Sequence, residues 1–205
     1  MKERAIYVHF DGMDLAGKST ATRLFVDQSG HDWDTRRNSI LEENSIHQLA
    51  DKLRKEGIYD PETIGNLYYA ALMADVRTFQ WPGRDTIQDS TLILRSIAFH
   101  TVRSTPRLPE MFLELIKLHP QFSGSFVFTA SIEQRRKRLE KRLLEAPETV
   151  SEEDMMVINK PEKFLAMEKC LAETAVRYFN ALVIDTSSRT PEEVVSMILQ
   201  SLKTK

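Results

Sequence analysis

Residues 12–19 read Gly-Met-Asp-Leu-Ala-Gly-Lys-Ser, which matches the spacing G-x-x-x-x-G-K-[ST] of a phosphate-binding loop. Glycines let the backbone curl tightly, so that successive N–H groups point inward at phosphate oxygens. The spacing assigns Lys18 to the β- and γ-phosphates of a nucleotide and the Ser19 hydroxyl to Mg²⁺. We therefore predict that ATP and Mg²⁺ are bound by Gly12, Asp14, Ala16, Gly17, Lys18, Ser19 and Thr20.

The residues on either side of this loop support the assignment. A β-rich run at residues 5–10 precedes the loop, and residues 18–29 suit a helix that ends near Gly30. A helix that begins at the loop adds its partial positive charge to the phosphate site. Strand, loop and helix in this order are the arrangement that the motif requires.

Length, charge and cysteine content narrow the class of protein. The chain of 205 residues is long enough for one domain with a sizeable core. Its formal net charge of −2 provides no global basic field, so we expect neither nucleic acid nor a membrane as a partner. The single cysteine, Cys170, excludes an internal disulfide framework. With no signal peptide and no long apolar run, these features predict the cytosol.

Strand-like and helix-like segments alternate along the chain. We expect strands near residues 5–10, 33–36, 85–89, 125–129 and 182–185. This alternation predicts a three-layer α/β fold, in which a mostly parallel five-stranded sheet carries helices on both faces. Ligands bind such sheets beyond the carboxyl ends of the strands, and Asp89 lies at one of those ends.

Local signals place several helix ends. Ser45–Gln48 and Ser131–Gln134 each have the form of a capping box, which predicts helices that start there. Thr190 followed by Pro191 and Glu193 predicts the start of the closing helix. Pro106 and Pro109 are expected to interrupt the helical pattern before a helix at 111–119.

A longer segment, residues 10–20, resembles the thymidylate kinase loop F-E-G-x-D-x-x-G-K-S-T. Further segments resemble that family at 35–36, at 74–77, at Asp89 with 98–100, and at 183–186 with 190–194. The resemblance implies that residues 1–205 form one P-loop kinase domain with a small helical lid at about 135–155. It also implies a homodimer, which is the usual state of that family.

The resemblance implies roles for several residues of the acceptor site. Asp14 would contact the sugar hydroxyl of the acceptor nucleotide. Arg36 and Arg77 would contact its phosphate, and His100 stands where the family reads the base with Gln. The family's D-R-Y becomes Asp89-Ser90-Thr91 here, so one phosphate-binding arginine is missing. Arg95 or Arg103 of the following helix could replace it.

The basic segment Arg135–Arg142 has two possible interpretations. Its arginines at 135, 138 and 142 recur at i, i+3 and i+7 and share one face, which suits a lid that stabilises the transferring phosphoryl group. The alternative is an ordinary solvated helix face. In the family, a catalytic arginine comes from the loop or from the lid. Because Leu15 stands in the loop, the resemblance assigns this role to Arg138 and Arg142.

Together these features predict an ATP-dependent phosphotransferase that acts on a nucleoside monophosphate. Lys18, Arg138, Arg142 and Asp89 are its expected catalytic residues, and Ser19 and Asp89 the expected Mg²⁺ ligands. Two alternatives stay open: a kinase of nucleosides or other small hydroxyl compounds, and a nucleotide-binding protein with a decayed acceptor site. For Asp89 the alternative is an ordinary turn acid.

Overall fold

One all-parallel sheet forms the centre of the molecule. The computed structural model describes residues 4–203. The strands are β1 (Tyr7–Asp11), β2 (Asp34–Asn38), β3 (Thr86–Thr91), β4 (Gly124–Thr129) and β5 (Leu182–Asp185). Their order is β2-β3-β1-β4-β5, and each neighbouring pair is parallel. The predicted α/β class with a five-stranded parallel sheet is therefore confirmed.

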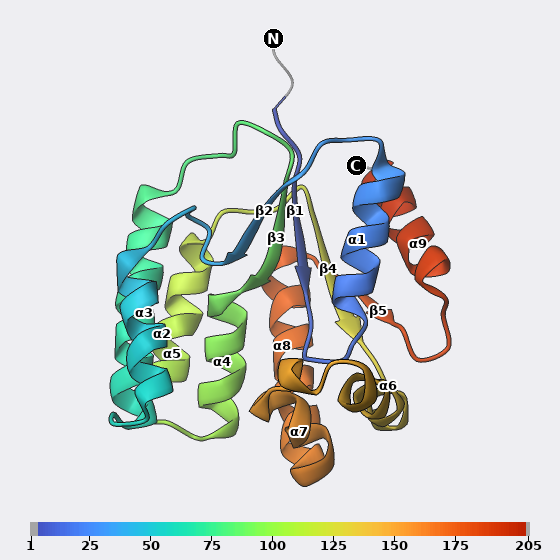
Figure 1. The fold of residues 1–205 in the computed structure, drawn as a ribbon. Helices are drawn as coiled ribbons and strands as arrows, with labels where there is room; N and C mark the ends of the chain where they lie inside the picture. The colour runs from blue at the N-terminus through green and yellow to red at the C-terminus, as the bar shows by residue number, and fades with distance from the viewer. Residues whose placement is uncertain (1–3, 204–205) are drawn as a thin grey trace.

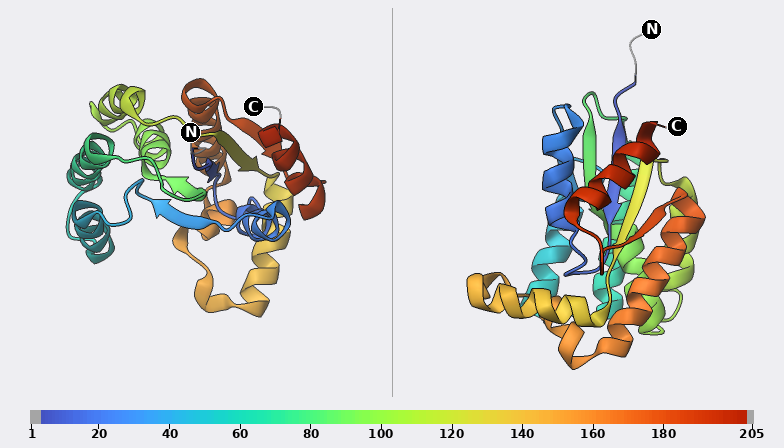
Figure 2. Two further views of the ribbon diagram at one scale, coloured as in Figure 1. Left: turned by 90° about the horizontal axis from the view of Figure 1, so that it is seen from above. Right: turned by 90° about the vertical axis from the view of Figure 1, so that its right-hand side faces the viewer.

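Helices cover both faces of the sheet, as Figures 1 and 2 show. On one face α1 (Lys18–Ser29) packs against α9 (Pro191–Lys203). On the other, α4 (Leu92–Val102) packs against α8 (Pro161–Phe179) and α5 (Leu108–Leu115). Beyond these, α3 (Pro61–Thr78) packs on α4 and α5, and α2 (Ser45–Glu56) packs on α3. The remaining segments are η1 (Ile116–Leu118), α6 (Ile132–Glu145), η2 (Pro147–Thr149) and α7 (Glu152–Asn159).

Two apolar clusters hold these layers together. The smaller cluster lies between the sheet and the pair α1 and α9, and it includes Phe10, Phe126 and Phe128. The larger cluster joins α3, α4, α5 and α8, and receives Val127 from the sheet. Val127 and its neighbours in β4 face opposite clusters because successive strand residues point to opposite faces. Among residues 4–203, no helix has both the length and the apolar character of a membrane span.

Two helix starts differ from the sequence-based expectation. Asn44, and not Ser45, is the N-cap of α2, and its side chain accepts hydrogen bonds from the N–H groups of Ile46 and His47. Ser45 is the first helical residue instead. Pro109 does not interrupt a helix but stands in the first turn of α5, where a missing N–H costs nothing. The expected caps at Ser131 and Thr190 are present.

A buried histidine, His119, follows η1 directly and packs into the core. His119 is 4% exposed and packs against Phe122 and Phe179, with ring centroids 5.4 and 4.9 Å away. Its Nδ1 lies 2.8 Å from the carbonyl oxygen of Pro120. Burial lowers the pKa of His119 to about 4, although the contact with Pro120 opposes the shift. Burial likewise lowers the pKa of His100 to about 4.

These pKa values predict a loss of stability in mild acid. Between about pH 6.5 and 4 the unfolded chain binds a proton at His119 that the folded chain excludes, so the free energy of unfolding falls as pH falls. Each such histidine contributes a slope of about 1.4 kcal/mol per pH unit. His119→Phe keeps the aromatic packing and should flatten the profile by that amount, as measured by urea unfolding across this range. Equal slopes in the variant and the wild type would contradict the prediction.

Candidate active site

A cleft with a volume of about 1710 Å³ opens at the carboxyl ends of the strands. Figure 1 shows the strand arrows pointing toward the end of the molecule where α6 and α7 lie. Residues 13–21 line the cleft, together with side chains from α2, α3 and α4 and from α6 and α7. The cleft is thus at the place where parallel sheets with this connectivity bind their ligands.

The loop has the backbone conformation that its glycines allow. Gly12 and Gly17 have φ angles of 145° and 83°, which favour glycine. A Cβ on Gly12 would lie 2.4 Å from the carbonyl oxygen of Phe128, so the strand β4 leaves no room for a side chain there. Gly17 is the N-cap of α1, and no side chain caps this end. The first N–H groups of α1 therefore remain available to a phosphate.

Four carbonyl oxygens of the loop accept hydrogen bonds from side chains of distant segments. Because the C=O and N–H of a trans peptide point in opposite directions, the N–H groups that follow are turned away from these side chains. The four N–H groups belong to Met13, Leu15, Ala16 and Gly17. The contacts run from Arg95 Nη2 to Gly12 (3.0 Å), from Arg135 Nη1 to Asp14, from Arg138 Nη1 to Leu15 (2.8 Å) and from Thr186 Oγ1 to Ala16 (2.8 Å).

Lys18 and Asp89 meet where the loop joins α1. The Lys18 ammonium contacts the Asp89 carboxylate, and Arg37 Nε lies 3.9 Å from the same carboxylate. Ser19 and Thr20 are exposed at the start of α1 and line the cleft. The structure therefore brings the residues predicted for the phosphates and the metal into one place. Within residues 4–203, no three His, Cys, Asp or Glu side chains gather as a metal site of their own.

Asp11, the residue just before the loop, was not among the predicted site residues. Its side chain is fully buried and accepts hydrogen bonds from the N–H groups of Gly12 and Thr91, at 2.8 and 2.9 Å. Burial alone would raise the pKa of Asp11. The hydrogen bond from His9 and the charge of Arg95 outweigh burial and hold the pKa well below its usual range. A carboxylate at the end of an apolar strand was the available sequence signal.

Asp14 lies in the cleft wall, and its predicted contacts with nucleotides stay predictions. Its side chain is half-buried and lines the cleft. Burial raises the pKa of Asp14, Arg95 opposes the shift, and the carboxylates of Asp154 and Glu153 on α7 add to it. The loop and α7 are therefore close enough for their charges to interact.

Arg36 does not reach the cleft, and its neighbour does. The Arg36 guanidinium donates to the carbonyl oxygen of Ile40 at 2.6 Å and lies outside the cleft lining. Arg37 lines the cleft beside Asp89. The two residues point to opposite sides because β2 is an extended strand. The expected contact of Arg36 with an acceptor phosphate does not fit this placement, and Arg37 is the arginine of β2 that lines the cleft.

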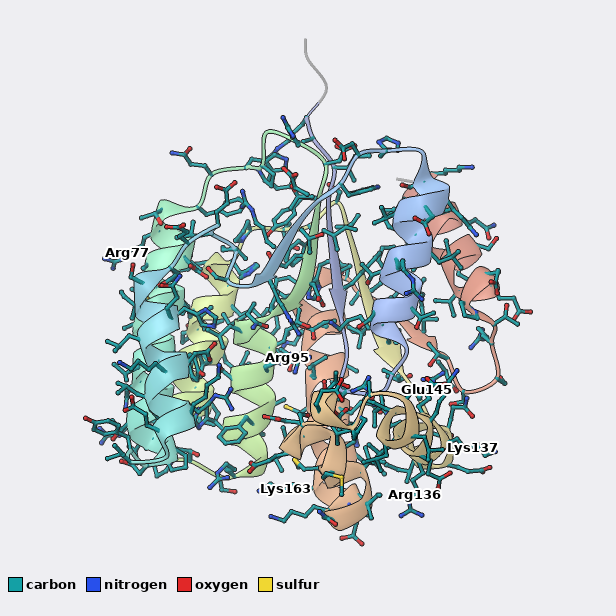
Figure 3. All side chains as sticks on the ribbon, viewed as in Figure 1. Arg77, Arg95, Arg136, Lys137, Glu145 and Lys163 are labelled. Atoms are coloured by element: carbon teal, nitrogen blue, oxygen red, sulfur yellow. The ribbon has the colours of Figure 1, made fainter. Side chains whose placement is uncertain are left out.

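Arg77 is also placed away from the cleft. It lies exposed on the outer side of α3, as Figure 3 shows, and does not line the cleft. Its expected contact with the acceptor phosphate does not fit this placement. Asp75 of the same segment is instead buried, where it accepts hydrogen bonds from Ser39 at 2.8 Å and from Asn44 at 2.6 Å.

Arg95 and His100 come from the same helix, α4, but differ in access. Arg95 projects toward the end of the central strands in Figure 3 and lines the cleft, with its Nε 3.7 Å from Asp11. His100 is only 2% exposed and stacks on Phe112 with the ring centroids 5.7 Å apart. Its Nδ1 lies 3.2 Å from the Thr105 hydroxyl. His100 therefore lines the cleft as part of its packed wall, and its expected part in reading the base stays a prediction.

The three arginines of α6 have separate environments. Arg135 is completely buried, whereas Arg138 and Arg142 line the cleft. Arg138 holds the loop at Leu15 and also donates to the carbonyl oxygen of Thr186 at 3.0 Å. Arg142 is paired with Asp154 of α7 at 2.9 Å and keeps 38% of its side chain exposed. Arg142 is therefore held by α7, whereas Arg138 is held by the loop and Thr186.

The network around Asp11 predicts a large effect of its removal. Asp11→Asn should lower the free energy of unfolding by roughly 2–4 kcal/mol, because buried donors and Arg95 lose their charged partner. Asp185→Asn is the matched control, since Asp185 ends β5 as an exposed carboxylate and its change should cost less than about 1 kcal/mol. Urea unfolding measures both values. Similar costs for the two variants would contradict the assigned role of Asp11.

Comparisons with known proteins find structural relatives only. No protein-family model matches the chain, and no curated protein sequence matches it. Among solved structures, a thymidylate kinase from Candida albicans superposes with a TM-score of 0.71 at 16% identity, covering 98% of this chain and 92% of that one. A thymidylate kinase from Ehrlichia chaffeensis superposes with a TM-score of 0.63 at 13% identity, covering 98% and 100%. The chain thus has a thymidylate kinase-like fold.

Proposed function

We propose that this protein is an ATP-dependent phosphotransferase that acts on a nucleoside monophosphate. The supporting observation is the charge of the cleft. Eleven lysines and arginines line it against five aspartates and glutamates, although the whole chain carries a net charge of −2. A concentration of positive charge in one cleft raises the local concentration of anionic ligands and favours their binding. Two phosphorylated nucleotides in the same cleft fit this distribution.

The donor would occupy the loop. The N–H groups of residues 13–17, the start of α1 and Lys18 would bind the phosphates of ATP. Mg²⁺ would be held by the Ser19 hydroxyl and Asp89 together with phosphate oxygens, and there it would neutralise developing negative charge. The contact between Asp89 and Lys18 at the end of the loop fits this set of donors.

The acceptor would lie opposite the loop, between α2, α3 and α4. Arg37 and Arg95 replace Arg36 and Arg77 as the proposed ligands of the acceptor phosphate, because both line the cleft near the loop. Phosphoryl transfer needs little covalent chemistry, so these residues act by orienting the acceptor oxygen and by stabilising charge. Once its ion pair with Asp154 breaks, the positive charge of Arg142 would help to stabilise the transferring phosphoryl group.

The proposed lid consists of α6, η2 and α7. Arg54 of α2 lies 3.7 Å from Glu153 of α7, so the two sides of the cleft already make a charged contact. Closure of such a lid would exclude water from the transferring group. The homodimer implied by the sequence resemblance and the single domain of residues 1–205 stay predictions.

One observation favours a different acceptor. Ser90 stands where the pattern of the thymidylate kinase family has a phosphate-binding arginine. The Ser90 side chain is only 3% exposed. A kinase of nucleosides or other small hydroxyl compounds would need fewer cations on the acceptor side. Arg37, Arg54, Arg95 and Arg103 all line the cleft from that side, which favours a phosphorylated acceptor.

Removal of Lys18 tests the donor site. Lys18→Ala should reduce ATP turnover by at least a thousandfold while the folded state persists, because a phosphate-binding charge is lost in the transition state. Turnover is measured by ADP release. Lys137→Ala is the matched control, since Lys137 is exposed on α6 and does not line the cleft. Wild-type turnover in Lys18→Ala would show that the loop does not bind the donor phosphates.

Removal of Arg37 tests the acceptor site. Arg37→Met should raise the KM for a nucleoside monophosphate by roughly 10- to 100-fold, the range expected for a lost charged hydrogen bond. The KM for ATP should change little. Arg77→Met is the control, because Arg77 is exposed outside the cleft. The assay measures ADP release with nucleosides and with nucleoside monophosphates as acceptors. Activity with nucleosides alone would contradict the proposed acceptor.

A further inference from the structure

The most unusual buried side chain in the molecule is Arg135. It is the largest of the fully buried residues, although it comes from the highly charged helix α6. Its guanidinium makes contacts in three directions. Nε donates to the carbonyl oxygen of Ala130 at 3.0 Å, Nη1 donates to the carbonyl oxygen of Asp14, and Nη2 donates to the Glu168 carboxylate. The guanidinium carbon also lies 4.9 Å from the ring centre of Phe164.

Stability alone gives a weak reason for this buried pair. Removing both charges from water costs several kcal/mol per ion, and apolar residues of similar size are often equally stabilising. An apolar pair at 135 and 168 could pack against Phe164 equally well. It could not donate to the carbonyl oxygens of Ala130 and Asp14, and of these two residues Asp14 belongs to the loop. The feature that distinguishes the charged pair is therefore its contact with the loop.

The contact falls where the loop backbone is least favourable. Leu15 has a φ angle of 62°, in the left-handed region that residues other than glycine rarely adopt. Such a conformation persists only when the surrounding structure holds it. Arg135 holds the peptide before Leu15 through the Asp14 carbonyl, and Arg138 holds the peptide after it through the Leu15 carbonyl. With both carbonyls fixed, the N–H groups of Leu15 and Ala16 point the opposite way.

We infer that Arg135 and Glu168 are a positioning pair that aims the N–H group of Leu15 at a phosphate of the bound nucleoside triphosphate. Glu168 orients the guanidinium, and Arg135 holds the Asp14 carbonyl away from the ligand. Neither side chain lines the cleft, so the pair acts only through the loop backbone. Arg95, Arg138 and Thr186 hold other loop carbonyls but line the cleft, where they can also touch a ligand. The inference rests on the proposed function only in that the ligand is a nucleoside triphosphate.

A double variant separates positioning from stability. Arg135→Met combined with Glu168→Leu removes both charges and keeps apolar contacts with Phe164. We expect the variant to stay folded, with a somewhat lower free energy of unfolding because the carbonyl oxygens of Ala130 and Asp14 lose their donor. Its dissociation constant for ATP, measured by calorimetry with Mg²⁺, should rise at least tenfold, and its KM for the acceptor should stay within twofold. Arg135→Lys keeps a charge beside Glu168 with fewer donors, and its ATP affinity should be intermediate.

The matched control is the exposed ion pair of the same helix. Lys137 Nζ lies 2.8 Å from Glu133, and Lys137→Met with Glu133→Leu should leave ATP affinity unchanged. Unchanged ATP affinity in a folded Arg135→Met, Glu168→Leu variant would overturn the inference. A wild-type chain that binds ATP but transfers no phosphate would refute the proposed function, and the affinity comparison would still decide the role of the pair.

Amide exchange provides a readout that needs no ligand. In the double variant, hydrogen exchange over residues 13–17 should be at least threefold faster than in the wild type, while exchange in the central strands stays the same. Equal exchange over the loop would overturn the inference. This measurement also decides the question if the wild-type chain binds no ATP, which would by itself refute the proposed function.

Discussion

The buried carboxylate of Asp11 is the interaction on which the site depends. It lies at the end of β1 and accepts hydrogen bonds from Gly12, the first residue of the loop, and from Thr91, at the junction of β3 and α4. One side chain thus fixes the loop against the neighbouring strand and the helix that supplies Arg95. A charge in this position costs desolvation, which His9 and Arg95 offset. The buried charge therefore fixes the geometry of the loop at a cost in folding free energy.

Further side chains fix the loop through its carbonyl oxygens. Arginines from α4 and α6 and a threonine after β5 donate hydrogen bonds to them. The segments that carry them are far apart in the sequence, so the loop conformation depends on the whole fold. The glycine spacing allows that conformation, and the surrounding side chains select it. This separation explains why a short motif recurs in proteins with different acceptors.

The two halves of the cleft differ in how they follow the family pattern. Residues 12–20 keep the sequence of the loop, and Gly12 and Gly17 have the positive φ angles that its tight turn uses. Two arginines that the family pattern assigns to the acceptor, Arg36 and Arg77, lie outside the cleft lining. Arg37 lines the cleft and Arg36 does not, because neighbouring residues of β2 face opposite ways. Arg77 is exposed on the outer side of α3.

The sequence by itself determined the fold class, the order of strands and helices, and the position of the loop. These features follow from local signals, namely glycine spacing, hydrophobic periodicity and helix caps, which act over a few residues. It could not determine that Arg135 is buried, that His100 packs on Phe112 in the cleft wall, or that Asp11 joins β1 to β3. Those features depend on contacts between segments up to 121 residues apart, such as Asp14 and Arg135. Only the tertiary structure decides which side of a helix or strand meets the cleft.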